Sequence, residues 1–292
     1  MQTWPAPAKL NLFLHIIGRR DDGYHLLQSA IQFIDLCDEL TFSPRADANI
    51  VCKNSNTNIS QQEDLCIRAA LLLQNQMAAK SENRQGVDIQ VNKRIPLGAG
   101  LGGGSSDAAT TLLALNQIWD CGLKQQELEL MAAQLGADVP VFVHGHASWV
   151  EGIGKELSSI TIEEPWYVVV FPDVHLNTQQ MFANSDLTRN CAPIKIRDFL
   201  QMCNEESLCF VDTQNVFEPL ARRHPVVERA FQCLGKYAPA RLTGSGSALF
   251  ITCASRQQAE EIAAGCAKEF TAYITKGLNV SPAISLSEYN QP

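Results

Sequence analysis

The stretch PLGAGLGGGSSDAA, residues 96–109, decides how the rest of the chain is interpreted. Five of the seven residues at 98–104 are glycine, and an apolar run suited to a helix follows at 108–115. Glycine lets the backbone approach a ligand without a Cβ, and serine or aspartate before an apolar run is typical of a helix N-cap. We therefore predict a glycine-rich loop that leads into a helix capped at 105–107. The free N–H groups and the helix dipole there favour an anion, usually phosphate.

Three interpretations of this loop compete. A plain flexible connection is disfavoured, because clustered glycines cost backbone entropy without any gain in packing. Gly98, Gly100 and Gly103 have the spacing of a dinucleotide fingerprint, but its acid would be Asp120, at the end of the next helix with no second strand between. A nucleoside-triphosphate loop fits the anion site. Since no lysine follows the glycines, its cation must come from elsewhere in the chain.

Composition indicates a globular protein with an acidic balance. The chain has 292 residues, enough for two domains, and a net charge of −8. That charge argues against broad binding to nucleic acids or anionic membranes. Residues 1–9 show no secretory signal, and apolar runs such as 167–171 are too short to span a bilayer. We expect a cytoplasmic protein with a small-molecule partner, neither nucleic acid nor membrane, as a monomer or weak homodimer.

The cysteines predict no metal site. None of the ten lies in a CxxC pair, and the six histidines form no HxxxH or HExxH pattern, so zinc is not expected. Scattered cysteines without an export signal indicate reduced thiols. We expect all ten to serve as small buried hydrophobic residues.

Alternating apolar residues predict a strand over residues 9–16. The even-numbered residues, Leu10 to Ile16, would share one face, and the odd-numbered residues, Lys9 to His15, the other. Lys9 and Asn11 are then neighbours. A lysine beside an amide at the head of a mostly apolar strand suggests a pair that faces a cleft.

Strands and helices are expected in both halves of the chain, which indicates an α+β protein of two lobes. After a turn at 19–23, strands are expected at 38–42, 87–91, 147–150, 166–171 and 272–278, with two more around a glycine turn at 241–252. Helices are expected at 64–77, 108–119, 125–135, 194–203, 215–222, 226–237 and 257–270. Residues 44–62 are expected to be a loop or hairpin tip, and 80–86 a polar connection. Residues 172–193 are expected to contain a strand end, a loop and a short helix, and a domain boundary is expected near 155–165.

Three segments together resemble the signature motifs of the GHMP kinase superfamily: PAKLNLFLHI at 7–16, the glycine-rich stretch at 96–109 and LTGSGSALF at 242–250. RRDDGYHLLQS at 19–29 and LGADVPVFVHG at 135–145 narrow the resemblance to members that phosphorylate a cytidine diphosphate derivative for isoprenoid synthesis. The resemblance covers nearly the whole chain.

The resemblance implies two α+β lobes with the active site in the cleft between them. We expect an N-terminal ATP-binding lobe over residues 1–158 and a C-terminal ferredoxin-like lobe over residues 159–292. The loop around the ATP phosphates would consist of Pro96, Leu97, Gly98, Ala99, Gly100, Leu101, Gly102, Gly103, Gly104, Ser105 and Ser106.

The resemblance also assigns individual roles. Lys9 and Asp138 match the catalytic lysine and aspartate, and Asn11 matches their partner in the first motif. Tyr24 and His25 match residues that recognise the cytidine. The aromatic residue on the other side of the base is matched by Phe182.

Phosphoryl transfer requires positioning and charge stabilisation. Asp138 would take the proton of the acceptor hydroxyl, and Lys9 would keep that carboxylate ionised and stabilise charge on the oxygens in flight. Mg²⁺ is expected to bridge the ATP phosphates, with Ser105 as a candidate hydroxyl ligand. From the residues alone, Asp138 fits a turn-holding role better, and the turn at 244–246 fits an ordinary hairpin and a cover for the loop equally well.

Two positions depart from the family pattern. Ile31 stands where an aromatic wall of the cytidine pocket is common, and Asp64 stands where an asparagine is common near the purine.

Three alternative functions remain: another GHMP kinase acting on homoserine or mevalonate, a dinucleotide-dependent oxidoreductase, and a non-catalytic binding protein. The presence of both Lys9 and Asp138 argues against a non-catalytic binding protein.

Overall fold

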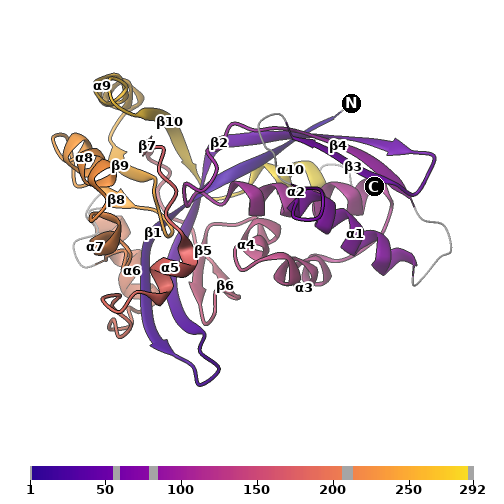
Figure 1. The fold of residues 1–292 in the computed structure, drawn as a ribbon, viewed down its shortest axis with the longest axis horizontal. Coiled ribbons are helices and arrows are strands. Elements are labelled where there is room, and N and C mark those ends of the chain that lie inside the picture. The colour runs from indigo at the N-terminus through magenta and orange to yellow at the C-terminus, as the bar shows by residue number, and fades with distance from the viewer. Residues whose placement is uncertain (1, 55–59, 79–84, 206–212, 289–292) are drawn as a thin grey trace.

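A long antiparallel hairpin connects two groups of helices and strands (Figure 1). The computed structural model describes residues 2–54, 60–78, 85–205 and 213–288. Strands β1 (Thr3–Arg19) and β2 (His25–Arg45) pair along almost their whole length and meet at the predicted turn. Strand β2 extends well beyond the expected 38–42, because pairing with several neighbours holds a segment whose own pattern is only partly strand-like.

A β-bulge in β1 changes which side chains share a face. Asn11 pairs with Ile31 but Phe13 pairs with Ala30, so one extra residue stands in β1 at position 12. Beyond a bulge the alternation reverses. Phe13 therefore joins Leu10 and Leu12 in one core cluster, while Leu14 and Ile16 belong to another. The predicted single face from Leu10 to Ile16 was wrong, but Lys9 and Asn11 lie before the bulge and remain neighbours.

The first group surrounds the right-hand half of the hairpin in Figure 1. Its helices include α1, α2 and α3 close to the predicted ranges, and strand β3 lies where a loop was expected at 44–62. The short apolar run at 50–52 forms a strand because β4 offers a parallel edge to it. The elements are β3 (Ile50–Asn54), α1 (Leu65–Ala78), β4 (Gly86–Asn92), α2 (Gly103–Ile118), α3 (Gln125–Leu135), α4 (Val139–His144), β5 (Ser148–Glu151) and β6 (Glu156–Ser159).

The second group forms an antiparallel sheet in the order β10-β7-β9-β8. Strand, helices, two strands, helix and strand follow one another along the chain, which is the ferredoxin-like arrangement. The predicted segments in this half are confirmed, with shifted ends. The elements are β7 (Trp166–Phe171), α5 (Thr178–Ala183), α6 (Ile196–Glu205), α7 (Glu218–Ala221), α8 (Pro225–Leu234), β8 (Arg241–Leu242), β9 (Leu249–Cys253), α9 (Arg256–Cys266) and β10 (Thr271–Leu278).

Contacts between the groups make one continuous sheet. Strand β10 also pairs with β2, so the described residues form a ten-stranded sheet. Helix α10 (Pro282–Glu288), which was not predicted, returns to pack against α2 and β1. The division into residues 1–158 and 159–292 stays a prediction. Within the described residues, none of the helices has the length and apolarity needed to cross a bilayer.

The cysteines of the described residues are free thiols. Six are buried and three, Cys37, Cys52 and Cys191, are partly exposed, so the expectation of full burial was wrong for these three. Cys209 lies outside the described residues. Cys233 and Cys266 bring their sulfur atoms within 3.3 Å of each other.

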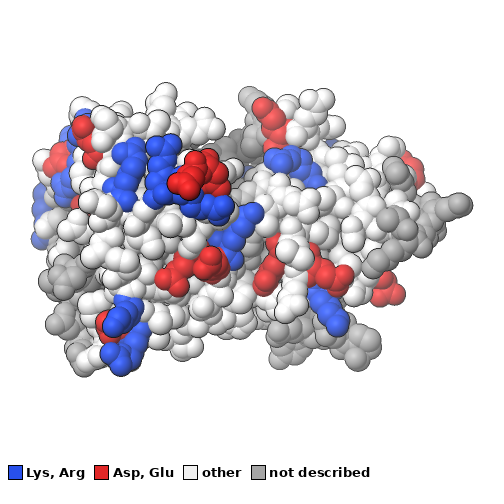
Figure 2. All heavy atoms as spheres, turned by 90° about the horizontal axis from the view of Figure 1, so that it is seen from below, with Lys and Arg blue, Asp and Glu red and all other residues white. Residues whose placement is uncertain are grey.

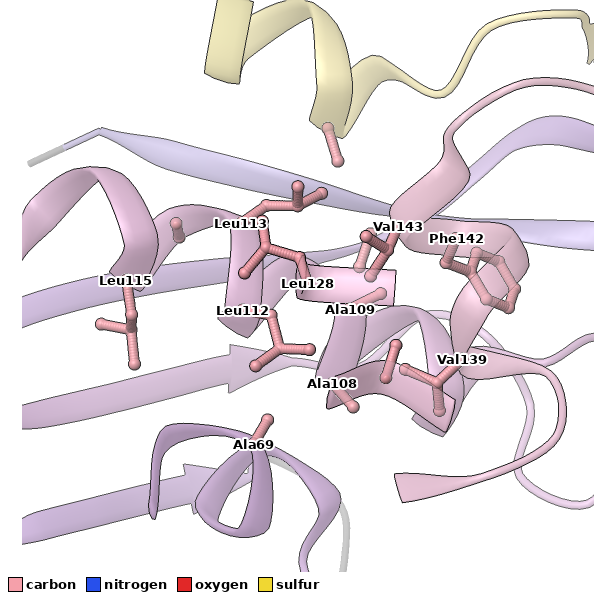
Figure 3. Close-up of a cluster of buried hydrophobic side chains, with 14 of the residues drawn as sticks. Ala69, Ala108, Ala109, Leu112, Leu113, Leu115, Leu128, Val139, Phe142 and Val143 are labelled. Atoms are coloured by element: carbon pink, nitrogen blue, oxygen red, sulfur yellow. The ribbon is translucent and has the colours of Figure 1, made fainter. Parts of the chain in front are cut away.

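The core of the first group is built around helix α2 (Figure 3). Leu112 points from α2 toward Ala69 of α1, while Leu113, Leu128 and Val143 gather on another side. Buried side chains on several sides of α2 explain why its sequence is apolar nearly all round. Its first turn is thereby fixed against the sheet that carries β1.

Leu112→Ala should lower the free energy of unfolding by about 2–5 kcal/mol, because Leu112 is fully buried and its removal leaves a cavity. The matched control is Leu130→Ala, since Leu130 is 70% exposed on α3 and its loss should cost at most about 0.5 kcal/mol. Urea denaturation measures both. Equal effects of the two substitutions would contradict the packing described here.

Candidate active site

The glycine-rich loop leads into α2 as predicted, but the cap differs. Helix α2 begins at Gly103, and Gly102 occupies the N-cap position with φ +75° and no side-chain cap. The expected cap at 105–107 was wrong, because glycine takes the left-handed conformation easily and starts the helix earlier. Ser106 is buried, and its N–H donates to the carbonyl of Gly102 at 2.9 Å. The other predicted loop residues, 96–105, line one cavity.

Two backbone contacts hold the loop in place. The N–H of Lys9 donates to the carbonyl of Leu101 at 3.0 Å, and the N–H of Ala248 donates to the carbonyl of Ala99 at 3.0 Å. Gly100 has φ +79°, and a Cβ there would clash with the carbonyl of Thr243. The turn at 244–246 connects β8 and β9 and also packs against the loop, so both interpretations of this turn are correct.

Two cavities meet at Lys9 and Asp138. The loop cavity, of about 310 Å³, is lined by residues 96–105 and by His175 and Leu176. The second cavity, also about 310 Å³, is lined by Asn11 and by mostly apolar residues. Their shared walls consist of Lys9, Ser105, Asp138, Thr178, Gly244 and Ser245. A group bound in one cavity would therefore meet a group bound in the other beside the predicted catalytic pair.

The lysine of this pair is buried and the aspartate is open to the cavities. Lys9 Nζ lies 3.6 Å from Asp138 Oδ2, with side-chain exposures of 3% and 50%. Asp138 precedes α4 at its N-cap position, but its carboxylate caps no N–H, so the turn-holding role is absent. The carboxylate is free to accept a proton from a ligand.

Asn11 holds the lysine from the other side. Lys9 Nζ donates to Asn11 Oδ1, and Asn11 Nδ2 donates to Ser29 Oγ at 2.9 Å. The N–H of Asn11 donates to Thr243 Oγ1 at 2.9 Å. Ser29 and Thr243 were missed in the sequence because a lone hydroxyl carries no local pattern. They fix Asn11, and through it the ammonium group, at the junction of the cavities.

Of the three residues predicted to contact the cytidine, only Phe182 lines the second cavity. Phe182 lines that cavity, and its ring stacks on His25 with centroids 5.2 Å apart. Tyr24 is 63% exposed at the hairpin tip and lines neither cavity. Ile31, which stands where an aromatic residue is common in the family, lines the second cavity and gives it an aliphatic wall.

His25 presents a defined tautomer. Arg189 Nε donates to His25 Nε2 at 3.2 Å, so this nitrogen is the acceptor and Nδ1 carries the proton. Burial, followed by the charges of Arg189 and Arg19, lowers the pKa of His25. The imidazole is therefore neutral at pH 7, with one N–H to donate. Arg189 gave no recognisable signal in the sequence.

A buried charge cluster supports the loop from behind. Lys93, at the end of β4, forms ion pairs with Asp38 of β2 and with Asp107 of α2, the latter at 2.6 Å. Asp38 also accepts the N–H of Ile95 at 2.8 Å. Burial raises the pKa of Asp107 to about 7, against the opposing charge of Lys93. The sequence did not reveal this cluster, because Lys93 lies 55 positions from Asp38 and 14 from Asp107, and no local pattern links them.

Surface charge is mixed on the face drawn in Figure 2. Lys and Arg side chains lie next to Asp and Glu side chains, with wide uncharged areas between them. Exposed ion pairs of the described residues include Arg223 with Asp186 at 2.7 Å. Such pairs contribute little to stability.

The comparisons with known proteins agree on one family. The GHMP kinases N terminal domain matches residues 64–146, and the GHMP kinases C terminal domain matches residues 196–272. A 4-diphosphocytidyl-2-C-methyl-D-erythritol kinase of Nitrosococcus oceani is 46% identical over 96% of each chain. One from Xanthomonas axonopodis pv. citri is 45% identical over 99% of this chain and 95% of its own.

Solved structures agree with these relatives. A crystal structure of 4-(cytidine 5'-diphospho)-2C-methyl-D-erythritol kinase superposes with a TM-score of 0.79 at 27% identity, covering 94% of this chain and 99% of that one. A mevalonate kinase superposes with a TM-score of 0.68 at 16% identity, over 96% of this chain and 100% of its own, and shares the fold. The dinucleotide interpretation of the loop was wrong, since α2 is followed by α3 with no strand between.

The contribution of Asp107 to stability should fall as the pH rises from about 4 to about 7, because burial raises the pKa of this carboxyl to about 7 in the fold, whereas it ionises near pH 4 in the unfolded chain. Asp107→Asn should remove this fall, so that the stability of the variant relative to the parent is greater at pH 8 than at pH 4. Urea denaturation from pH 4 to pH 8 measures the difference, and exposed Asp173→Asn is the control. A parallel pH profile for Asp107→Asn and the parent would contradict this assignment.

Proposed function

This chain belongs to the GHMP kinases and, among them, to the 4-diphosphocytidyl-2-C-methyl-D-erythritol kinases, and from this premise we propose how its residues carry out the reaction. It is an ATP-dependent small-molecule kinase of isoprenoid biosynthesis. Its acceptor is the 2-hydroxyl of 4-diphosphocytidyl-2-C-methyl-D-erythritol. The observation that supports the assignment of residues is that Lys9 and Asp138 line both cavities.

The loop cavity holds the ATP phosphates in this proposal. Backbone N–H groups at the start of α2 and the positive end of its dipole face an anion there. A Cβ on Gly100 would meet the carbonyl of Thr243, so glycine at this position lets the loop lie close against the turn at 244–246. The terminal phosphate then lies at the junction, where Ser105, Thr178 and Ser245 add hydroxyl donors.

Asp138 acts as the general base and Lys9 as the stabilising cation. The acceptor hydroxyl, held in the second cavity, gives its proton to the open carboxylate of Asp138 as its oxygen attacks the terminal phosphorus. Lys9, fixed by Asn11, stays 3.6 Å from that carboxylate and places its charge where negative charge develops. Because the ammonium is buried, little reorganisation is needed at the moment of transfer.

Mg²⁺ fits the oxygen donors at the junction. The hydroxyl of Ser105 lines the loop cavity, and a hydroxyl oxygen is a ligand type that Mg²⁺ accepts. Ser105 would hold the ion together with ATP phosphate oxygens. Bound Mg²⁺ would neutralise phosphate charge during transfer.

The second cavity takes the cytidine end of the substrate. The apolar side chains around Ile31 and Phe182 bury a planar base, and the N–H at His25 Nδ1 donates to an acceptor on its edge. Tyr24, at the open tip of the hairpin, closes over the base from outside. We propose the same cytoplasmic location, monomer or weak homodimer state and absence of a nucleic-acid partner that the composition predicts.

Asp138→Asn should lower kcat by about 10²–10⁴-fold with little change in ATP affinity, because a positioned base stabilises the transition state. Lys9→Ala should lower kcat similarly. Asp120→Asn is the matched control: Asp120 is exposed with φ +51°, which asparagine tolerates, and full activity is expected. An ATP-consumption assay with the cytidine substrate measures all three, with mevalonate and homoserine as negative substrates. Near-normal turnover in Asp138→Asn would remove that residue from the mechanism.

His25→Ala should raise the KM for the cytidine substrate by about tenfold and leave the KM for ATP nearly unchanged, since His25 lies beside the second cavity alone. His175→Ala gives the reciprocal control, because His175 lines only the loop cavity and should affect ATP instead. Steady-state kinetics with each substrate varied in turn separates the two effects. A His25→Ala enzyme with an unchanged KM for the cytidine substrate would refute this pocket.

A further inference from the structure

Two thiols and a carboxylate gather beside the start of α1, outside the active site. Cys52 lies on β3, and Asp64 and Cys66 lie on either side of Leu65 at the beginning of α1. One ligand atom from each of the three lies within 4.8 Å of the other two. Among the described residues, no other group of three such side chains comes this close together.

The sequence shows no sign of this cluster of Cys52, Asp64 and Cys66. Cys52 and Cys66 are separated by 13 residues in the sequence, so no short zinc motif appears. The prediction of no metal site considered only short motifs. The parallel pairing of β3 with β4 and the packing of α1 against β3 bring the two cysteines together. Asp64 lies next to them because it directly precedes α1, which carries Cys66.

The carboxylate is already oriented. Asp64 Oδ1 accepts the N–H of Cys66 at 2.8 Å and so caps the helix, while Asp64 Oδ2 accepts a hydrogen bond from Asn54 Nδ2. The other amide atom, Asn54 Oδ1, is buried and accepts no hydrogen bond within the described part of the chain. A carboxylate held by a helix N–H and by an amide is the supporting arrangement that metal ligands use.

The distances suit a tetrahedral ion. Zinc–sulfur bonds of about 2.3 Å and zinc–oxygen bonds of about 2.0–2.2 Å place ligand atoms within about 4 Å of one another. The present ligand atoms lie within 4.8 Å of one another, so they would have to approach by less than about 1 Å on binding an ion. Cys52 is partly exposed, which gives an ion a path to the otherwise buried cluster.

We propose that Cys52, Asp64 and Cys66 form a binding site for a thiophilic divalent cation of the zinc type. On binding, each thiol loses its proton to solvent as its sulfur bonds the ion. A water completes the tetrahedron and donates a hydrogen bond to Asn54 Oδ1, which otherwise lacks a donor. Thiolate ligands select zinc over magnesium, so the site is distinct in chemistry from the one at the ATP phosphates.

Because Leu65 lines the loop cavity, the site adjoins the nucleotide without sharing a residue with the catalytic pair. An occupied site would join β3 to the first turn of α1. It should therefore stabilise the first group of elements, and this effect can be measured in the absence of any substrate.

The test uses the full chain, reduced and freed of metal by a chelator, with no nucleotide present. Titration with Co²⁺ should give thiolate charge-transfer absorption and the visible bands of tetrahedral cobalt, and Zn²⁺ should displace it at about one ion per chain. Zn²⁺ should raise Tm, and excess Mg²⁺ should not displace it. Cys52→Ser should weaken zinc binding by at least about tenfold and abolish the increase in Tm.

Two further variants make the test specific. Asp64→Asn keeps the helix cap, since asparagine caps as well as aspartate, and should weaken zinc binding because it removes the charged ligand. The double variant Cys233→Ser with Cys266→Ser removes the other close thiol pair and should bind zinc like the parent. If Cys52→Ser proves misfolded by circular dichroism, Asp64→Asn decides the result. Cobalt spectra without thiolate absorption, spectra unchanged in both site variants, or loss of the thiols to a disulfide without metal binding would each overturn the proposal.

Discussion

The backbone contact between the glycine-rich loop and the turn at 244–246 is the constraint on which the rest of the site depends. A Cβ on Gly244 would lie 2.8 Å from the carbonyl of Gly100, so neither chain segment can carry a side chain there. This approach brings a segment from each half of the sequence to the mouth of one cavity. The hydrogen bond from Lys9 to Leu101 then adds β1 to the same junction.

The position of Lys9 is set by the contact between β1 and the loop, and the loop has no lysine of its own. In the proposed mechanism a phosphate loop without its own lysine takes its cation from another strand, and β1 can supply it because its backbone is hydrogen-bonded to the loop. Burial of an ammonium group is costly unless it is paired, and Asn11 with Asp138 provides those partners. Lys93 is likewise buried and paired, with Asp38 and Asp107, and these contacts connect the residue after β4 to β2 and to the N-terminal half of α2.

The sequence allowed prediction of those elements that have an apolar periodicity of their own and of those site residues that lie in recognisable motifs. The strand with Lys9, the helices α1 to α3 and the strands of the second half were visible, since each has a local apolar pattern. The bulge at residue 12, the cap at Gly102 and strand β3 were not, because each depends on a neighbour distant in sequence. In the site, the motifs identified Lys9 and Asp138 but not Ser29, Thr243 or Arg189, whose positions only the tertiary fold determines.

The central claim is that one acceptor alcohol and the terminal phosphate of ATP meet between Lys9 and Asp138. A crystal structure with a non-hydrolysable ATP analogue and 4-diphosphocytidyl-2-C-methyl-D-erythritol tests it directly. The account predicts a triphosphate along residues 98–105 and the 2-hydroxyl within about 2.6–3.2 Å of an Asp138 carboxylate oxygen. A triphosphate bound away from the glycine-rich loop, or a 2-hydroxyl on the far side of the cavity from Asp138, would contradict it.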